Sequence, residues 1–335
     1  MINFDPRRAT LERWLAGRYP GRAVTLAPAS EDASFRRYFR LRIEGETSLV
    51  AMDAPPGKED CRPFVHVATL FGAAGVHVPR VYAADFGEGF LLLEDLGCTT
   101  YLERLDSRSA PALYSAATDA LLRIQLATRP DMLPAYDRVL LERELRLFSE
   151  WYVARQLDQS LSAAETETLE AAFAVILANN LAQPNVYVHR DYHSRNLMVC
   201  DPAPGVLDFQ DAVYGPVTYD LASLLKDAYL RWDEEQVLDW AIRYWEKARR
   251  AGLPVAPDFA DFYRDFEWMG AQRHIKVAGI FARLCHRDGK QRYLADIPRV
   301  LEHLLATCRR YHELNPLALL LDRLHERAAA AGARL

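Results

Sequence analysis

The spacing of hydrophobic positions along the chain changes near residue 100. Before that point, Leu11, Trp14, Leu15 and Tyr19 recur at helical spacing, which predicts an amphipathic helix over residues 7–19 that caps the following structure. Short apolar runs come next and predict strands, with one helix between them. The strand pattern begins at residue 24. The later expected strands cover 35–43, 49–54, 78–83 and 89–93, and the expected helix covers 59–71.

Beyond residue 100, apolar residues recur every three or four positions almost to the end, which predicts a largely helical region. Ser162 followed by Glu165 is a capping-box pattern and predicts the start of one of these helices. Short apolar runs in the middle predict small strands around a tight loop. The expected helices are 101–105, 110–126, 140–157 and 162–181, and the expected small strands are 186–188, 197–200 and 205–209.

Composition narrows the class of protein. The chain has 335 residues, half of them hydrophobic, which is long enough for two lobes with separate cores. A net charge of −5 lacks the excess of basic residues that nucleic-acid-binding proteins carry. No apolar run approaches the ~20 residues of a membrane span. The N-terminal residues lack the apolar stretch of a secretion signal. Scattered cysteines predict reduced thiols in a cytoplasmic protein; they are Cys61, Cys98, Cys200, Cys285 and Cys308.

Residues 186–211 hold His189, Asp191, Asn196 and Asp208 at the spacing of a kinase catalytic loop followed by a metal-binding strand. Phosphoryl transfer needs a carboxylate to orient the attacking hydroxyl and oxygen ligands to hold magnesium against the triphosphate. Asp191 suits the first role, and Asn196 and Asp208 suit the second. Each residue alone would fit an ordinary turn. An acid inside an apolar strand, however, is costly unless it is paired or binds a cation.

These residues resemble the aminoglycoside phosphotransferase and choline kinase branch of the protein-kinase-like fold. Further motifs are similar to the bacterial N-acetylmuramate/N-acetylglucosamine anomeric kinases: SFRRYFR at 34–40, AMDAPP at 51–56 and VHRDYHSRNLMV at 188–199. The resemblance implies an α+β, two-lobed fold. Its N-lobe, an antiparallel β-sheet that covers the nucleotide, is expected over 1–96, and its mostly helical C-lobe over 97–335. ATP and Mg²⁺ are the implied cofactors.

In this resemblance, the turn at 29–34 takes the place of the Gly-rich loop that covers the ATP phosphates. The turn requires small side chains such as Ser34 and exposed backbone N–H groups. An ordinary hairpin turn would have the same sequence. Arg36 and Arg37 follow directly and favour the nucleotide-binding interpretation, because a guanidinium group suits a phosphate.

The third expected strand departs from the kinase pattern. Because side chains alternate along a strand, Ala51 and Asp53 are expected to face the nucleotide together, with Asp53 where kinases carry a phosphate-pairing lysine. The expected partner helix also lacks the matching glutamate. Two interpretations remain open: either Arg36, Arg37 or Lys58 carries the phosphate charge while Asp53 anchors one of them, or the chain is a weak or inactive kinase. The intact catalytic loop and metal ligands favour the first.

The apolar run at 90–93 leads into Glu94 and Leu96, where a hinge joining the two lobes belongs. The resemblance implies that the backbone at these two residues pairs with the edge of adenine. A buried strand that ends in a turn would have the same sequence, so only the position in the chain indicates a hinge.

Other residues of the catalytic region have less specific roles. His189 is expected to be structural, and Asp220 suits a helix N-cap; the resemblance implies that Asp220 braces the catalytic loop through its backbone. His193 and Arg195 lie between Asp191 and Asn196 in sequence and are candidates for substrate contact. Asp211 is grouped with them, as a residue that either assists the metal or caps a turn.

Residues 267–276 place polar groups in an otherwise apolar helix. The resemblance implies that this part of the C-lobe walls the acceptor pocket. Arg273 or Lys276 would then meet the lactyl carboxylate of N-acetylmuramate, and Trp268 would stack on a sugar face. A solvated helix face is the alternative.

The residues thus predict a cytoplasmic, ATP- and Mg²⁺-dependent small-molecule kinase. The resemblance implies that it phosphorylates the anomeric hydroxyl of N-acetylmuramate and N-acetylglucosamine in cell-wall sugar recycling. The alternatives are a kinase of another hydroxyl compound (an aminoglycoside, choline or homoserine) and a non-catalytic nucleotide-binding regulatory protein. A cationic acceptor should meet carboxylates, whereas the expected wall mixes Glu267 with Arg273, His274 and Lys276. No feature predicts a nucleic-acid or membrane partner, and the oligomeric state stays open.

Overall fold

The computed structural model describes residues 5–31 and 35–332, with only the backbone described at 30 and 31. The chain forms two compact units. The first comprises residues 1–100 together with 197–211, and the second comprises residues 101–196 together with 212–335. The chain therefore returns to the first unit for residues 197–211. The expected division, with one boundary between residues 96 and 97, does not include this return.

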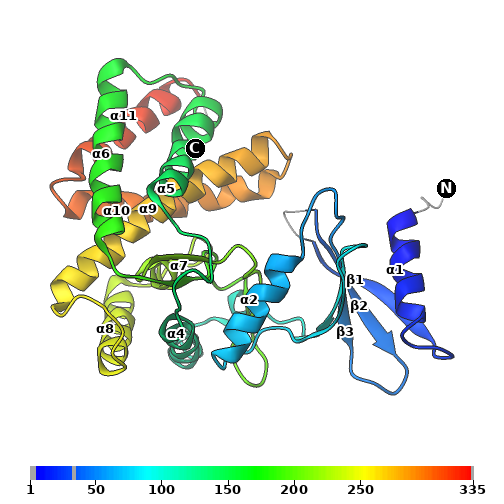
Figure 1. Cartoon of the computed structure of the whole chain (residues 1–335). Helices are drawn as coiled ribbons and strands as arrows, with labels where there is room; N and C mark the ends of the chain where they lie inside the picture. The colour runs from blue at the N-terminus through cyan, green and yellow to red at the C-terminus, as the bar shows by residue number, and fades with distance from the viewer. Residues whose placement is uncertain (1–4, 32–34, 333–335) are drawn as a thin grey trace. The chain divides into compact units, whose positions relative to one another are not determined.

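The first unit is built on a five-stranded antiparallel sheet in the order β1-β2-β3-β5-β4 (Figure 1). Strands and helices lie where the sequence predicts them, apart from shifts of a few residues at their ends. The elements are α1 (Pro6–Ala16), β1 (Val24–Glu31), β2 (Arg37–Ile43), β3 (Leu49–Asp53), α2 (Arg62–Ala73), β4 (Val81–Asp85), β5 (Phe90–Glu94) and the small pair β7 (Leu197–Met198) and β8 (Gly205–Val206).

Helix α1 covers one face of this sheet, so the predicted capping helix is confirmed. Its Leu11 and Leu15 are fully buried in a cluster with side chains from β2, β3 and β5. Burial of one such side chain contributes about 1.5–3 kcal/mol, which fixes the helix to this face. The cluster consists of Leu11, Leu15, Phe39, Leu41, Ile43, Ala51, Phe90 and Leu92.

The second unit is mostly helical, as predicted. Its helices are α3 (Tyr101–Arg104), α4 (Ala110–Leu126), α5 (Arg138–Leu147), a π-helical continuation η1 (Phe148–Gln156), α6 (Ala163–Ala182), α7 (Tyr219–Leu225), α8 (Glu234–Arg250), α9 (Phe259–His286), a 3₁₀ turn η2 (Gln291–Asp296), α10 (Ile297–Arg310) and α11 (Asn315–Ala330). The capping box at Ser162 and Glu165 forms as predicted. Within the described residues, no helix combines the length and the apolarity needed to cross a membrane.

The 28-residue helix α9 is the centre of the second unit and contacts α5, α6, α7, α10, η1 and η2. Gly279 permits its close approach to the junction of α5 and η1, because a Cβ at that position would lie 2.4 Å from the carbonyl carbon of Leu147. A small sheet of β6 (Asn185–Val188) and β9 (Val213–Pro216) brackets the predicted catalytic loop. Strand β9 was not predicted from the sequence.

Candidate active site

The loop that follows β6 is held by a buried carboxylate from α7. Asp220 accepts hydrogen bonds from the backbone N–H of His189 at 2.6 Å and of Arg190 at 3.0 Å. The expectation that Asp220 braces the loop is confirmed, although Thr218 and not Asp220 is the N-cap of α7. Arg190 has a positive φ of 77°, a conformation that costs an L-residue about 1–3 kcal/mol. The two hydrogen bonds that Asp220 accepts hold this strained turn.

The rest of the loop is tied to itself and to the segment after α7. His189 is buried, and its Nδ1 accepts a hydrogen bond from the backbone N–H of Asp191 at 3.2 Å, so it has the structural position expected for it. Asn196 donates its Nδ2 to the carbonyl of Asp191 at 2.9 Å. Ser194 donates both its N–H (2.9 Å) and its hydroxyl (2.5 Å) to Oδ2 of Asp227. The backbone of the loop is thus fixed at several points.

Asp191 is an ionised carboxylate among cations. Burial alone would raise its pKa, but the positive charges of Lys276, Arg273 and Arg190 outweigh burial and lower the pKa to about 2. The neighbouring His193 has its pKa lowered by burial, against the charges of Asp227 and Asp191. Asp191 therefore carries its negative charge throughout the physiological pH range.

A buried polar cluster lies behind the loop. Glu144 of α5 pairs with Arg190 at 2.5 Å and with Lys276 at 3.1 Å, and it accepts a hydrogen bond from Tyr136. Lys276 also donates to the hydroxyl of Tyr219 at 3.0 Å. Burial opposes ionisation of Glu144, but Lys276 and Arg190 lower its pKa below the ordinary value. The charges in this cluster compensate one another inside the protein.

The polar stretch of α9 is buried, so the alternative of a solvated helix face is wrong. Arg273 is 7% exposed and donates Nη1 to the carbonyl of Arg190 at 2.6 Å, next to the predicted catalytic residue Asp191. Trp268 is 2% exposed, with its ring 5.8 Å from that of Tyr311 and the guanidinium of Arg264 4.5 Å over it. The expectation that Trp268 stacks on a sugar is corrected, because both protein neighbours and burial cover its ring.

Arg195 and His193 meet around an aromatic residue that the sequence did not single out. The guanidinium of Arg195 lies 3.6 Å above the ring of Tyr229, and the ring of His193 meets Tyr229 edge-on at 5.5 Å. The backbone N–H of Tyr229 donates to Oδ1 of Asp227 at 2.9 Å. The mixed aromatic and charged run at 226–232, directly after a buried helix, was the available sequence signal for this group.

The other predicted metal ligand belongs to the first unit. Asp208 follows β8 with a positive φ of 61°, and its Oδ1 accepts from Gln210 at 2.9 Å. The guanidinium of Arg36 lies 3.4 Å from the same oxygen. Asp211 accepts a weaker bond from Gln210 at 3.3 Å and is exposed. The structure thus brings together one predicted phosphate ligand and one predicted metal ligand.

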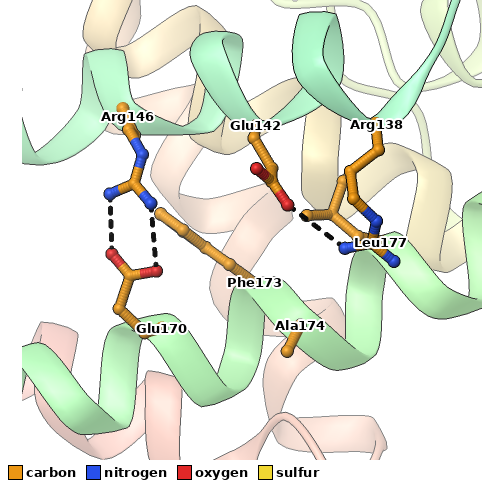
Figure 2. Close-up of a pocket in the computed structure, with 7 residues that line it drawn as sticks. All are labelled: Arg138, Glu142, Arg146, Glu170, Phe173, Ala174 and Leu177. Atoms are coloured by element: carbon orange, nitrogen blue, oxygen red, sulfur yellow. Dashed lines mark hydrogen bonds and ion pairs between the residues drawn. The ribbon is translucent and has the colours of Figure 1, made fainter.

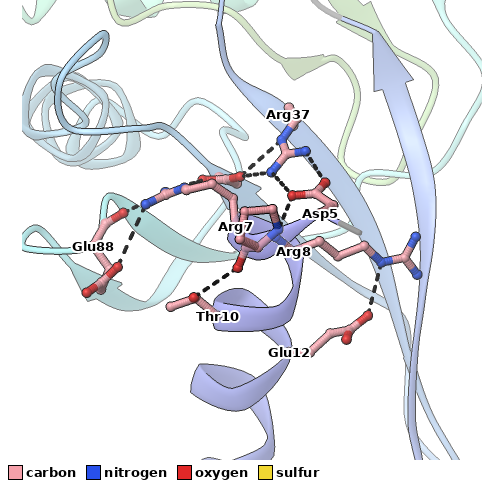
Figure 3. A network of polar contacts seen from close by, with 9 residues as sticks. Asp5, Arg7, Arg8, Thr10, Glu12, Arg37 and Glu88 are labelled. Carbon is pink, nitrogen blue, oxygen red and sulfur yellow. Dashed lines mark hydrogen bonds and ion pairs between the residues drawn. The ribbon is translucent and has the colours of Figure 1, made fainter. Parts of the chain in front are cut away.

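Arg37 has a different environment. It donates Nε to Asp53 at 3.0 Å, and it is also paired with Asp5. Arg7 of α1 donates to the other oxygen of Asp53 at 3.1 Å and to the carbonyl of Glu88 at 2.8 Å. Figure 3 shows Arg37, Asp5 and Arg7 in this network. Asp53 therefore anchors an arginine, as one interpretation of the sequence proposed.

Ala51 and Asp53 do share a face of β3, but that face is covered by α1. Ala51 lies in the α1 cluster, and Asp53, which is fully buried, pairs with Arg7. This corrects the expectation that both side chains face a nucleotide. By strand alternation, the residues on the opposite face are Val50 and Met52.

The expected hinge residues Glu94 and Leu96 contact other residues of the first unit. The backbone N–H of Glu94 donates to the carbonyl of Arg80 at 2.9 Å, and its carboxylate lies 3.2 Å from Nε2 of His77. Leu96 is buried against Gly205, where a Cβ would come within 2.8 Å of its side chain. Ser34 lies outside the described residues. Lys58, the third basic candidate, has its ammonium 5.1 Å from the ring centroid of Phe35.

A pocket between α5 and α6 lies apart from the predicted site residues. It is lined by Arg138, Glu142, Arg146, Glu170, Phe173, Ala174 and Leu177 (Figure 2). Its charges pair across it and along α5, with Arg146 at 2.8 Å from Glu170 and Arg138 at 3.1 Å from Glu142. It holds none of the residues that the sequence predicts to bind or react.

A family model and curated relatives match most of the chain. A model of the phosphotransferase enzyme family (APH) matches residues 25–254. The N-acetylmuramate/N-acetylglucosamine kinase of Pseudomonas aeruginosa is 52% identical over 305 residues, covering 91% of this chain and 90% of that protein. The protein of the same name from Neisseria meningitidis serogroup B is 50% identical, covering 94% of this chain and 95% of its own length.

Solved structures agree on the fold. A choline/ethanolamine kinase family protein from Mesorhizobium loti has a TM-score of 0.63 at 13% identity and covers 94% of this chain and 98% of its own. An ADP-bound aminoglycoside phosphotransferase has a TM-score of 0.57 at 14% identity, with 88% and 97% covered. These likenesses confirm the predicted α+β, kinase-like fold. With its matched model and its relatives at about half identity, the chain belongs to the phosphotransferase enzyme family.

Proposed function

We propose that the protein is an ATP- and Mg²⁺-dependent kinase that transfers the γ-phosphoryl group to the anomeric hydroxyl of N-acetylmuramate and N-acetylglucosamine. The names of its half-identical relatives support the choice of sugar. The observation that carries the reaction is the ionised Asp191, set among cations on a loop braced by Asp220. That arrangement is what in-line phosphoryl transfer requires of a protein.

Asp191 acts on the acceptor mainly by orientation. A carboxylate with a pKa of about 2 is a weak base, so early removal of the hydroxyl proton would be unfavourable. It accepts a hydrogen bond from the anomeric hydroxyl, holds it in line with the phosphorus, and takes the proton as the new bond forms. An anomeric hydroxyl is more acidic than an ordinary alcohol, which suits a base of this strength.

Asn196 and Asp208 would hold the metal. Their oxygens are the hard ligands that Mg²⁺ prefers. The amide nitrogen of Asn196 donates to the carbonyl of Asp191. An amide binds a metal through its oxygen, so an amide and a carboxylate form a donor set that suits the ion. Bound there, Mg²⁺ would offset the negative charge that develops in transfer.

Arg36 is the proposed phosphate ligand in place of the missing lysine. Of the three basic candidates, its guanidinium is the one beside the metal ligand Asp208, whereas Arg37 is held by Asp53 and Asp5. The loop containing Ser34 would cover the phosphates, and the backbone of Glu94 and Leu96 would meet the adenine.

A rival function is phosphorylation of a cationic acceptor, since solved neighbours include aminoglycoside and choline/ethanolamine kinases. The surroundings of Asp191 disfavour it. Arg190, Arg195, Arg273 and Lys276 all lie on or against the catalytic loop and would repel a cation. A neutral or acidic sugar fits this charge distribution better. A cytoplasmic location is proposed from the scattered cysteines, which are all free.

The test is ADP release with ATP and Mg²⁺, measured in parallel with N-acetylmuramate, N-acetylglucosamine, glucose, kanamycin, choline and homoserine. We expect turnover with the two N-acetylated sugars and its loss in Asp191→Asn. Turnover with another acceptor alone would overturn the sugar assignment and keep the kinase. No turnover with any acceptor, while ATP still raises the melting temperature, would favour a non-catalytic nucleotide-binding protein.

A further inference from the structure

The cations around Asp191 differ in whether the protein already uses them. Lys276 pairs with Glu144 at 3.1 Å and with the hydroxyl of Tyr219 at 3.0 Å. Arg190 pairs with Glu144 at 2.5 Å, and Arg273 donates to the carbonyl of Arg190 at 2.6 Å. These side chains are committed to the cluster behind the loop. The earlier expectation that Arg273 or Lys276 meets a substrate carboxylate is therefore disfavoured.

Arg195 is the exception among these cations. Within the described part of the chain, no carboxylate lies within ion-pair distance of it; its guanidinium carbon lies over the ring of Tyr229, 3.6 Å from the ring centroid. A guanidinium that stacks by its face keeps the N–H groups along its edge, which match a carboxylate in the bidentate geometry. Arg195 is also partly exposed and lies four residues after Asp191.

The platform under Arg195 is rigid. Asp227, only 2% exposed, accepts from Ser194 with Oδ2 and from the backbone N–H of Tyr229 with Oδ1. One carboxylate therefore fixes both the loop that carries Arg195 and the aromatic ring below it. The ring of Tyr229 also contacts that of Phe281 at 5.9 Å. Preorganisation of this kind lowers the entropy lost when a ligand binds.

We propose that Arg195, stacked on Tyr229, binds the lactyl carboxylate of N-acetylmuramate and distinguishes this sugar from N-acetylglucosamine. The inference rests on the proposed function and names the specificity residue within it. The two sugars differ by the lactyl ether on O3, which carries a carboxylate. That carboxylate would enter a site that already holds the anionic Asp191 and a triphosphate, so it needs a cation not yet paired. Arg195 supplies that cation.

The experiment compares three acceptors: N-acetylmuramate, its neutral lactyl amide, and N-acetylglucosamine. KM and kcat are measured for the wild type, Arg195→Gln and Tyr229→Leu. Arg231→Gln is the matched control, because it removes the same charge two residues after Tyr229, at an exposed side chain paired with Glu302. Far-UV circular dichroism and melting temperature check that each variant is folded.

We expect Arg195→Gln to raise KM for N-acetylmuramate about tenfold to hundredfold, as for loss of a hydrogen bond to a charged group. KM for the amide and for N-acetylglucosamine should change far less, so the preference for acid over amide disappears. Tyr229→Leu should reduce the same preference by a smaller factor, and Arg231→Gln should keep it. The change should appear in KM and not in kcat.

Equal losses on the acid, the amide and N-acetylglucosamine would overturn the inference, because they would indicate a structural role for Arg195. A preserved preference for acid over amide in Arg195→Gln would overturn it as well. Neither result affects the proposed function. Failure of the wild type to phosphorylate either sugar would instead overturn the proposed function, and the inference with it.

Discussion

Replacing Glu144 by glutamine would remove a carboxylate that Arg190 and Lys276 share behind the catalytic loop. The Glu144 side chain is 6% exposed, and the two cations are 2.5 and 3.1 Å from it. The glutamine amide would keep the shape and the hydrogen bond with Tyr136 but leave two buried positive charges without their counterion. Removal of one partner from a buried ion pair costs about 3–5 kcal/mol.

That cost translates into a measurable shift of the melting temperature. The second unit contains roughly 220 residues, for which an unfolding entropy near 2.1 cal/mol/K per residue gives about 2 °C per kcal/mol. The expected decrease is therefore roughly 6–10 °C by differential scanning calorimetry. Glu142→Gln, on the same helix α5, breaks only the exposed pair with Arg138 and should cost at most about 1 kcal/mol.

The same variant should also lower kcat, because Arg190 carries the carbonyl held by Arg273 and lies next to Asp191. Steady-state kinetics at a temperature well below the melting point separate this effect from unfolding. If Glu144→Gln melted within about 2 °C of Glu142→Gln, the reasoning from a buried, shared counterion would be refuted. Loss of stability with an unchanged kcat would show that the cluster does not position the loop.

Three other substitutions test the contacts of the site. Arg36→Ala should raise KM for ATP about tenfold or more and KM for the sugar far less. It should also tighten Mn²⁺ binding in the absence of nucleotide, measured by electron paramagnetic resonance, because the guanidinium that competes with the metal for Asp208 is removed. Equal effects on KM for ATP and for the sugar would contradict the role of Arg36 as a phosphate ligand. Asp191→Asn should reduce kcat by a factor of about 10²–10⁴ while ATP still raises the melting temperature, and residual activity near that of the wild type would contradict its role. Burial raises the pKa of Asp220 to about 7, so between about pH 4 and pH 7 the folded state holds a proton that the unfolded state has lost. Its contribution to stability should fall as pH rises through this window, by up to about 4 kcal/mol. Urea unfolding at pH 5 and pH 8 tests this: an Asp220→Asn variant that showed the same pH dependence as the wild type would rule it out.

The sequence by itself determined the features that depend on near neighbours. The apolar runs at 186–188 and 197–200 predict a tight loop between two small strands, and in the structure the bond from Asn196 to the carbonyl of Asp191 closes this loop. The capping box at Ser162 formed as predicted, because both of its bonds span three residues. The strands of the first unit followed from apolar runs, since a single strand needs only its own alternation to be recognised.

Tertiary structure alone decided which face and which partner each side chain received. Alternation places Ala51 and Asp53 on one face of β3, but only the docking of α1 decides that this face is covered, through Arg7, which lies 46 residues from Asp53. Arg36 and Arg37 are adjacent, yet one reaches Asp208, 172 residues away, and the other Asp53.

The sequence could not identify the residues on the acceptor side of the site either, because their environment depends on packing. The polar residues of α9 suit either a solvated face or a buried network, because their pattern is the same until α5 and α7 pack against them. For this reason the sequence predicted a sugar contact at Trp268, which is buried, and did not single out Tyr229, whose backbone Asp227 fixes beside the loop. Burial and charge pairing are properties of the packed chain, so the sequence names the reacting groups while the fold selects the ones that remain available to a substrate.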